Sequence, residues 1–287
     1  TSEQGNKWGL CDQALKEAIR MIKESQKFHF GDHRSVDSLF TKDAGKQVYI
    51  DSDCGNLRLP YKIMWADYTD PMSRHISKIG ILTTQITETF WHMMHFAYNT
   101  THKSWQLYPV VNLILIGGLT PENEKMLKKV YPLHNFDLTD KRITNLSVNV
   151  RGCEEIINRD SSSIDADINE NVVLFRNTIL LMNCKNIQTE KIPAPEALNK
   201  KRRKAGKQEL FDYHVLNVVV PSKKRGYHES TEPLSHNRVH LCRGHFKEYT
   251  AEHPLFGHYT GLYWWQPHVR GQNRDGVVMK DYNVKAA

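Results

Sequence analysis

The spacing of apolar positions near the start of the chain predicts a helix. Leu15, Ala18 and Ile22 recur at three- and four-residue intervals, and Asp12 precedes them as a suitable N-cap residue. The pattern predicts an amphipathic helix over roughly residues 12–27.

Five runs rich in β-branched and aromatic residues follow, and each is bounded by Asp, Gly, Asn, Pro or Thr. They read KQVYID, RLPYKIMWADY, KIGILTTQI, ETFWHMMHFAY and SWQLYPVVNLILIGG. Runs of this length predict a meandering, mainly antiparallel sheet of about five strands.

Two further segments have the features of helices. TPENEKMLKKVY begins with a capping residue at Thr120, followed by proline and by acidic residues in the first turn. Residues 168–184 are long enough for a helix whose buried face holds Val172, Phe175, Ile179 and Met182. Helices placed among runs of strands without regular alternation are typical of the α+β class. We therefore expect a mainly antiparallel sheet with a few helices and a C-terminal β-rich region.

A change in composition suggests how the chain divides. Residues 191–209, KIPAPEALNKKRRKAGKQE, combine prolines with a basic cluster that cannot bury a face, so we expect a linker or loop there. This places an N-terminal α+β domain at residues 1–190. A C-terminal β-rich domain would cover residues 210–287, beginning with the strand FDYHVLNVVVP.

Charge is distributed unevenly between these parts. From Asn199 onward the chain has 16 Lys/Arg and 8 Asp/Glu, whereas the preceding residues have 23 and 24. The excess of the +7 chain thus lies in its last third and suggests a polyanionic partner, nucleic acid first and an anionic membrane surface second. The alternative is a solvated basic surface. Five residues are the candidate phosphate contacts: Lys200, Lys201, Arg202, Arg203 and Lys204.

Other features limit the class of protein. No apolar run approaches the length of a membrane helix, because the longest, VVNLILIGG, has the size of a strand. Five scattered cysteines without paired spacing argue against a disulfide framework. We expect a soluble cytoplasmic protein with no cofactor.

The densest group of chemically reactive residues lies in residues 237–271, NRVHLCRGHFKEYTAEHPLFGHYTGLYWWQPHVRG. If RVHLCRG and LYWWQPHVRG are paired strands, His240 or His245 faces His268 across a shared groove. Arg243 or Arg270 then lies beside these imidazoles. Pro267 requires an edge or bulge position, because proline cannot donate to a ladder.

Such a groove suits RNA cleavage without a metal. Histidines act as base and acid near neutral pH, arginine stabilises phosphate charge, and aromatic rings stack on unpaired bases. The base activates the ribose 2′-hydroxyl and the acid protonates the leaving oxygen. The candidate catalytic residues are His240, His245, His268, Arg243, Arg270 and Tyr249. Trp264 and Trp265 are the candidate stacking platform.

Competing interpretations remain for the same residues. They can be residues at the edge of a core, satisfied by backbone carbonyls, or they can form a groove that only binds its partner. His240, Cys242 and His245 are zinc ligand types, but no second pair completes a known arrangement, so we assign no metal. His92 and His95 fall on opposite faces of their strand, which argues against a shared metal there.

The blocks RVHLCRGHFKEYT, PLFGHYTGLYWWQPHVRG and GVVMKDYNV resemble the C-terminal end of uncharacterised proteins encoded by phages and prophage-like elements. RLPYKIMWADY and SKIGILTTQ are similar to the same group. The resemblance covers roughly residues 238–284. It implies a viral or mobile-element origin and a setting in the host-cell cytoplasm, and it brings no known activity with it.

Two hypotheses of function follow. The first is a phage-type protein directed at nucleic acid, with RNA favoured, whose C-terminal groove cleaves RNA without a metal. The second is a non-catalytic phage-encoded protein that binds a host protein or nucleic acid, or forms part of an assembly.

Overall fold

The computed structural model describes residues 15–32, 57–70, 76–132, 136–142, 144–149, 154–219, 238–242, 245–265, 268–270 and 272–277. For residues 109, 149, 154–167, 238–242, 245, 268–270 and 272–277 the description is of the backbone.

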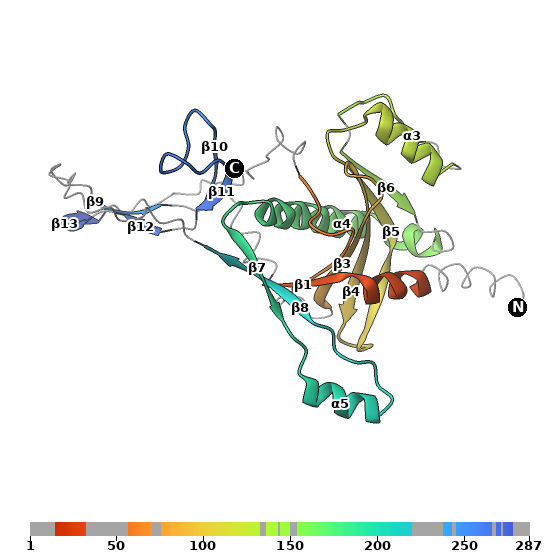
Figure 1. Cartoon of the computed structure of the whole chain (residues 1–287). Coiled ribbons are helices and arrows are strands. Elements are labelled where there is room, and N and C mark those ends of the chain that lie inside the picture. Colours follow the sequence, from red (N-terminus) through yellow and green to blue (C-terminus); the bar gives the residue numbers. More distant parts are fainter. Residues whose placement is uncertain are drawn as a thin grey trace, which may run out of the picture.

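An eight-stranded sheet with the order β6-β5-β4-β3-β2-β1-β8-β7 forms the body of the described chain (Figure 1). The strands are β1 Gln26–Asp32, β2 Ile63–Thr69, β3 Ile76–Gln85, β4 Phe90–Asn99, β5 Ser104–Leu115, β6 Asn145–Asn149, β7 Ile187–Ile192 and β8 Tyr213–Val218. β1 pairs in parallel with β2 and β8, and the other neighbours are antiparallel. The expected α+β class is confirmed, with a sheet that is mixed rather than purely antiparallel.

The strands β2 to β5 arise from four of the five expected runs, joined by short turns as antiparallel neighbours. The first run, KQVYID, lies outside the described residues. Gly80 in β3 shows how tightly this sheet packs, because a Cβ there would collide with the ring of Trp65 and lie 3.0 Å from Trp105.

Residues 15–24 are helical, and the expected end at residue 27 is wrong. The backbone N–H of Ser25 still bonds to Met21 O at 2.9 Å, but Gln26 is already opposite Met64 in the β1–β2 ladder. Parallel pairing with β2 satisfies the backbone groups that a longer helix would have used. The expected start at residue 12 lies outside the described residues.

Helix α3 (Pro121–Val130) confirms the interpretation of TPENEKMLKKVY. The Thr120 hydroxyl accepts from the Asn123 N–H at 3.2 Å, and proline occupies the first turn. Leu127 is fully buried and attaches the helix to the core.

Helix α4 (Glu154–Met182) covers one face of the sheet and begins earlier than the expected residue 168. Val172, Phe175 and Ile179 are buried as expected, whereas Met182 is partly buried. The hydroxyls of Tyr68 in β2 and Thr178 in α4 lie 2.9 Å apart and connect sheet to helix.

The opposite face of the sheet has its own core. Ala18 from the first helix and Leu127 from α3 pack there with Trp65, Leu82 and Phe96. The sheet is therefore the middle of three layers. None of the described helices is long and apolar enough to cross a membrane.

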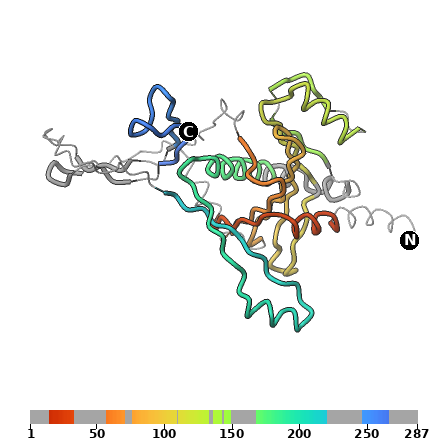
Figure 2. Tube along the Cα trace, viewed as in Figure 1, coloured from red at the N-terminus to blue at the C-terminus, as the bar shows by residue number. Residues whose placement is uncertain are grey.

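Residues 191–209 are not the expected linker or loop. They contain the end of β7 and helix α5 (Glu196–Lys204), and β8 then returns to the sheet beside β1 (Figure 2). β8, expected in a separate C-terminal domain, thus pairs with a strand from the start of the chain. Its parallel pairing with β1 joins segments far apart in sequence, which a local pattern cannot reveal.

The remaining strands form two small sheets. β10 (His245–Tyr249) pairs with β11 (Gly261–Trp265), and β9 lies between β12 and β13. The bounds of the second group are β9 Arg238–Cys242, β12 His268–Arg270 and β13 Gln272–Val277. The expected pairing of the two late strand segments is present only in part. Residues 268–270 pair with β9, whereas residues 261–265 pair with β10, and His268 lies opposite Cys242 rather than opposite His240 or His245.

Candidate nucleic-acid interface

Helix α5 lies at the end of the β7–β8 hairpin, beyond the edge of the main sheet (Figure 1). Pro195 precedes the helix, and Gly206 follows it with a φ of 63°. The Lys207 N–H bonds to Arg202 O at 2.9 Å and the Gly206 N–H to Arg203 O at 3.1 Å. This pair of bonds is a Schellman motif, which requires the left-handed conformation that glycine adopts readily.

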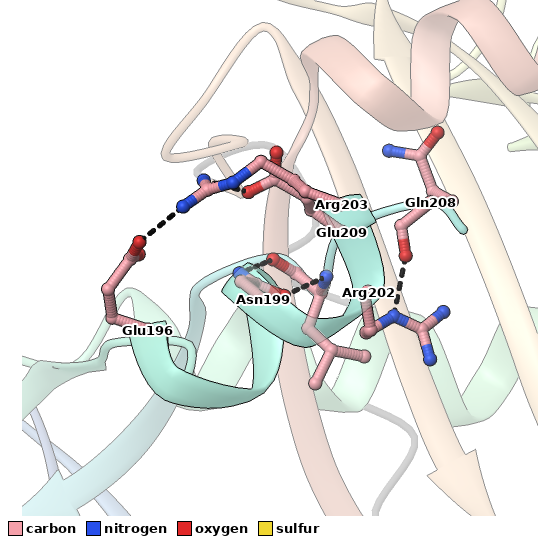
Figure 3. A network of polar contacts seen from close by, with 7 residues as sticks. Glu196, Asn199, Arg202, Arg203, Gln208 and Glu209 are labelled. Carbon is pink, nitrogen blue, oxygen red and sulfur yellow. Dashed lines mark hydrogen bonds and ion pairs between the residues drawn. The ribbon is translucent and has the colours of Figure 1, made fainter. Parts of the chain in front are cut away.

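A polar network fixes α5 to the segment that follows it (Figure 3). Asn199, which is buried, donates to Leu210 O at 3.0 Å and accepts from the Leu210 N–H at 2.7 Å. Arg203 forms ion pairs with Glu196 and Glu209, the latter at 2.9 Å. The helix is held against its return strand by hydrogen bonds and ion pairs rather than by a large apolar core.

The network separates two kinds of cation on α5. Hydrogen bonding to Glu196 raises the pKa of Arg203, whose charge is matched inside the hairpin. Arg202 donates from Nε to Gln208 O at 2.6 Å. Within the described residues, four exposed lysines of this segment have no ion pair: Lys200, Lys201, Lys204 and Lys207.

Three of these lysines lie on one side of the helix, and Lys207 follows its C-terminal end. At about 100° per residue, Lys200, Lys204 and Lys201 fall within one third of the helix circumference, on the side away from Asn199. The acidic residues nearby are already paired, because Glu196 and Glu209 bind Arg203 while Asp212 binds Lys191 at 2.7 Å. We call Lys200, Lys201, Lys204 and Lys207 the lysine patch. Unmatched positive charge concentrated in this way favours polyanions.

Two exposed rings follow the lysine patch along the chain. Phe211 and Tyr213 are 39% and 37% exposed. Lys27 Nζ lies 4.2 Å from the centroid of the Phe211 ring, and the His29 ring meets Tyr213 edge-on at 6.2 Å. Lys27 and His29 are two residues apart in β1, and Phe211 and Tyr213 are two residues apart in extended chain. Side chains two residues apart point to the same face, so all four lie on one side of the sheet. We call Lys27, His29, Phe211 and Tyr213 the aromatic strip.

His29 in this strip is oriented by a carboxylate. Its Nδ1 lies 2.9 Å from Asp67 Oδ2, across the parallel β1–β2 ladder. The His29 side chain is 36% exposed and that of Asp67 is 19% exposed. A hydrogen bond at Nδ1 fixes the ring and leaves Nε2 as the nitrogen for a ligand.

The aromatic strip was not predicted from the sequence. The signals were the alternations in KFHF and FDYH, each of which puts two ring or cationic residues on one face of an extended segment. Each alternation alone is typical of any half-buried strand. Only the pairing of β1 with β8 brings the two together.

The C-terminal residues fall into several groups. Arg270 lies opposite His240 and His268 opposite Cys242 in the antiparallel β9–β12 ladder, so these four register positions share a face. His245 begins β10, where its partner is Trp265. Arg243 lies outside the described residues.

Tyr249 is not placed beside these histidines. It is at the far end of β10 from His245, about 13 Å away along the strand at roughly 3.3 Å per residue. Its ring meets Tyr263 edge-on at 5.6 Å, and Lys247 Nζ lies over it at 4.8 Å. The hairpin geometry thus separates Tyr249 from the expected groove.

Trp264 does not provide the expected stacking platform. It is 2% exposed and belongs to the core that α4 covers, in contact with Phe246 at a ring distance of 4.6 Å. Trp265 is half-buried, and its buried Nε1 has no hydrogen-bond partner among the described residues. Adjacent residues of a strand point to opposite faces, but this alternation does not show which face of the hairpin packs against the body.

The histidines of β4 are structural. His95 is fully buried, its Nε2 lies 2.8 Å from Asn112 Oδ1, and burial lowers its pKa to about 4. His92 packs near Tyr131 on the opposite side of the strand, and burial lowers its pKa also to about 4. The expected placement on opposite faces is confirmed. Within the part of the chain that the structure describes, no group of three metal-ligand side chains is present.

In comparisons with known proteins, no family model, no curated protein and no solved structure matches this chain. The lysine patch, the aromatic strip and the β9–β12 ladder are the features of this structure that bear on its function.

Proposed function

We propose that this protein binds nucleic acid and that the lysine patch on α5 is its main phosphate contact. The observation that carries the proposal is the division of charge on this helix. Arg203 is paired within the hairpin, whereas four exposed lysines have no ion pair within the described residues. When lysines without an ion pair contact phosphates, they displace the counterions that surround the nucleic acid. This release is a main source of affinity for nucleic acid.

The wider distribution of charge supports the same partner. The surplus of basic residues lies in the last third of the chain, which contains α5. The resemblance to proteins of phages and prophage-like elements supports a viral or mobile-element origin and action in a host cytoplasm. RNA is the favoured nucleic acid. The competing proposal is a non-catalytic factor that uses this patch to bind an acidic host or viral protein.

Metal-independent RNA cleavage is the second candidate function, and the β9–β12 register favours it. His240 lies opposite Arg270, and His268 lies two positions along the same face. One imidazole would take the proton of the ribose 2′-hydroxyl, whose oxygen then attacks phosphorus. The other would protonate the departing 5′-oxygen, leaving a 2′,3′-cyclic phosphate, while Arg270 stabilises the phosphate charge.

Salt-dependent binding tests the first function. A variant with Ser at Lys200, Lys201, Lys204 and Lys207 should lose most affinity for a labelled oligonucleotide. The slope of log K against log salt should become shallower by about 3, because each lost phosphate contact contributes roughly 0.7 to 0.9. The matched control replaces four exposed lysines elsewhere with Ser: Lys16, Lys62, Lys125 and Lys129. Equal losses in both variants, or affinity that ignores salt, would contradict the proposal.

Cleavage is tested separately with labelled RNA in the presence of EDTA. His240→Ala and His268→Ala should each abolish the appearance of 2′,3′-cyclic phosphate ends. His253→Ala, which removes an exposed imidazole between β10 and β11, is the control. Intact RNA with the unmodified protein, or cleavage indifferent to both substitutions, eliminates the nuclease and leaves the binding function standing.

A further inference from the structure

We infer that the aromatic strip makes this interface specific for single-stranded nucleic acid, with unpaired bases stacked on Phe211 and Tyr213. This inference rests on the proposed function, because it assigns the phosphates of the same strand to the lysine patch. It names the class of nucleic acid and the side chains that recognise it.

The lysine patch and the aromatic strip follow one another directly along the chain. The side chain of Asn199 forms hydrogen bonds with both the N–H and the C=O of Leu210, so the chain leaves α5 in a fixed position. Phe211 is the next residue, and Tyr213 starts β8. The rings therefore follow directly from the helix that carries the lysine patch, on a segment whose path is held by Asn199 and by the β7–β8 ladder.

Large aromatic side chains are usually buried, yet Phe211 and Tyr213 are each more than one third exposed. Their neighbours hold them in place without burying them, since Lys27 lies over one side of Phe211 and His29 meets Tyr213 edge-on. Rings that are held in place and partly exposed lose little freedom when a base stacks on them.

Lys27 Nζ is positioned by Ser25 O at 2.8 Å and by Lys23 O at 3.3 Å. The Asp67 carboxylate orients the His29 imidazole at 2.9 Å. A cation and an oriented ring nitrogen next to two aromatic faces suit a base with its adjoining phosphate. In duplex nucleic acid the faces of the bases are already stacked and are not available to such rings.

The experiment compares three probes of one sequence: single-stranded RNA, single-stranded DNA and duplex DNA. Phe211→Leu and Tyr213→Leu keep apolar bulk and remove the ring. Each should weaken binding of the single strands about tenfold, the order of magnitude measured for loss of one base–aromatic stack. Binding of the duplex and the salt slope should not change, because no phosphate contact is removed.

The control is Phe256→Leu, which removes a ring of matched exposure, 38%, from the loop between β10 and β11. Thermal unfolding of each variant monitors the fold. If all three probes bind with equal, lysine-dependent affinity and the ring variants are silent, the inference fails while the proposed function survives. If no probe binds in a salt-dependent manner, the proposed function itself fails. A ring variant that weakens duplex and single strand alike also overturns the inference.

Discussion

The side chain of Asn186 forms hydrogen bonds with both the backbone N–H and the backbone C=O of Trp264. Asn186 Nδ2 donates to Trp264 O at 2.7 Å, and the Trp264 N–H donates to Asn186 Oδ1 at 2.9 Å. Asn186 is 5% exposed and precedes β7, while Trp264 lies in β11 and buries its ring in the core beneath α4. One amide group thus connects the β10–β11 hairpin to the main sheet.

Asn186→Ala should destabilise the protein by about 2 to 4 kcal/mol, because it removes two buried hydrogen bonds to the backbone of Trp264. Denaturation in urea, followed by intrinsic fluorescence, measures the change. The control is Asn217→Ala, since Asn217 is exposed and bonds to Glu190 at the surface. Equal midpoints for both variants would show that the Asn186 contacts do not hold the hairpin.

The buried imidazole of His95 predicts a loss of stability in mild acid. Burial lowers its pKa in the folded protein to about 4, whereas the unfolded chain takes up the same proton near the ordinary value of about 6.5. Between these two values the unfolded state binds more protons, so the free energy of unfolding falls as the pH falls from about 6.5 to 4. One such histidine contributes a slope of up to about 1.4 kcal/mol per pH unit.

His95→Gln should make that dependence shallower by up to one proton, with the difference confined to this pH window. Urea titrations at half-unit intervals provide the slope. His253→Gln serves as the control, because His253 is exposed. An unchanged slope in His95→Gln would mean that His95 is accessible to protons in the folded state.

Gly206→Ala should loosen helix α5 without disturbing the sheet. A Cβ at Gly206 meets no atom within 4 Å, so the cost arises from the positive φ of 63° and amounts to about 1 kcal/mol. Hydrogen exchange of the α5 amides should become several-fold faster while that of β3 and β4 is unchanged. The control is Ala205→Gly. Ala205 has a φ of −90°, which alanine adopts readily, so glycine brings no conformational advantage at this position. Unaltered protection of α5 in Gly206→Ala would argue against the Schellman motif as its C-terminal stop.

Gly80→Ala should instead affect the whole body of the protein. The added methyl group would collide with the ring of Trp65, which packs across Gly80 within the sheet. Overpacking of this kind costs about 1 to 3 kcal/mol, and the thermal midpoint should fall accordingly. The double variant Gly80→Ala with Trp65→Leu should recover part of the loss, whereas additive losses would rule out the collision as the cause.

Local patterns predicted the local parts of this fold. Alternation and turn residues located β2 to β5, and the Thr120 cap located α3, because these elements depend on neighbours in sequence. Helix α5 was missed although Pro195 and Gly206 mark its ends, since its charge density was interpreted as a solvated loop. The β1–β8 pair was beyond such patterns, because nothing in either strand specifies its partner.

For the candidate sites, too, local features were predictable from the sequence and tertiary contacts were not. Pairing of the two late strand segments was predicted and is present in part, and the lysines of residues 200–204 remain candidates for phosphate contact. Trp264 was misplaced because alternation assigns a face but does not say which face becomes covered. His29 and Phe211 lie far apart in sequence, so only tertiary pairing places them on the same surface.

The position of β1 between β2 and β8 has a consequence for biosynthesis. Until residues 213–218 leave the ribosome, β1 has one unsatisfied edge that exposes backbone donors and acceptors to other nascent chains. During that interval Lys27 and His29 lack the rings of Phe211 and Tyr213, which they contact in the folded protein. Completion of the sheet beside β1 and assembly of the aromatic strip therefore both depend on the synthesis of β8.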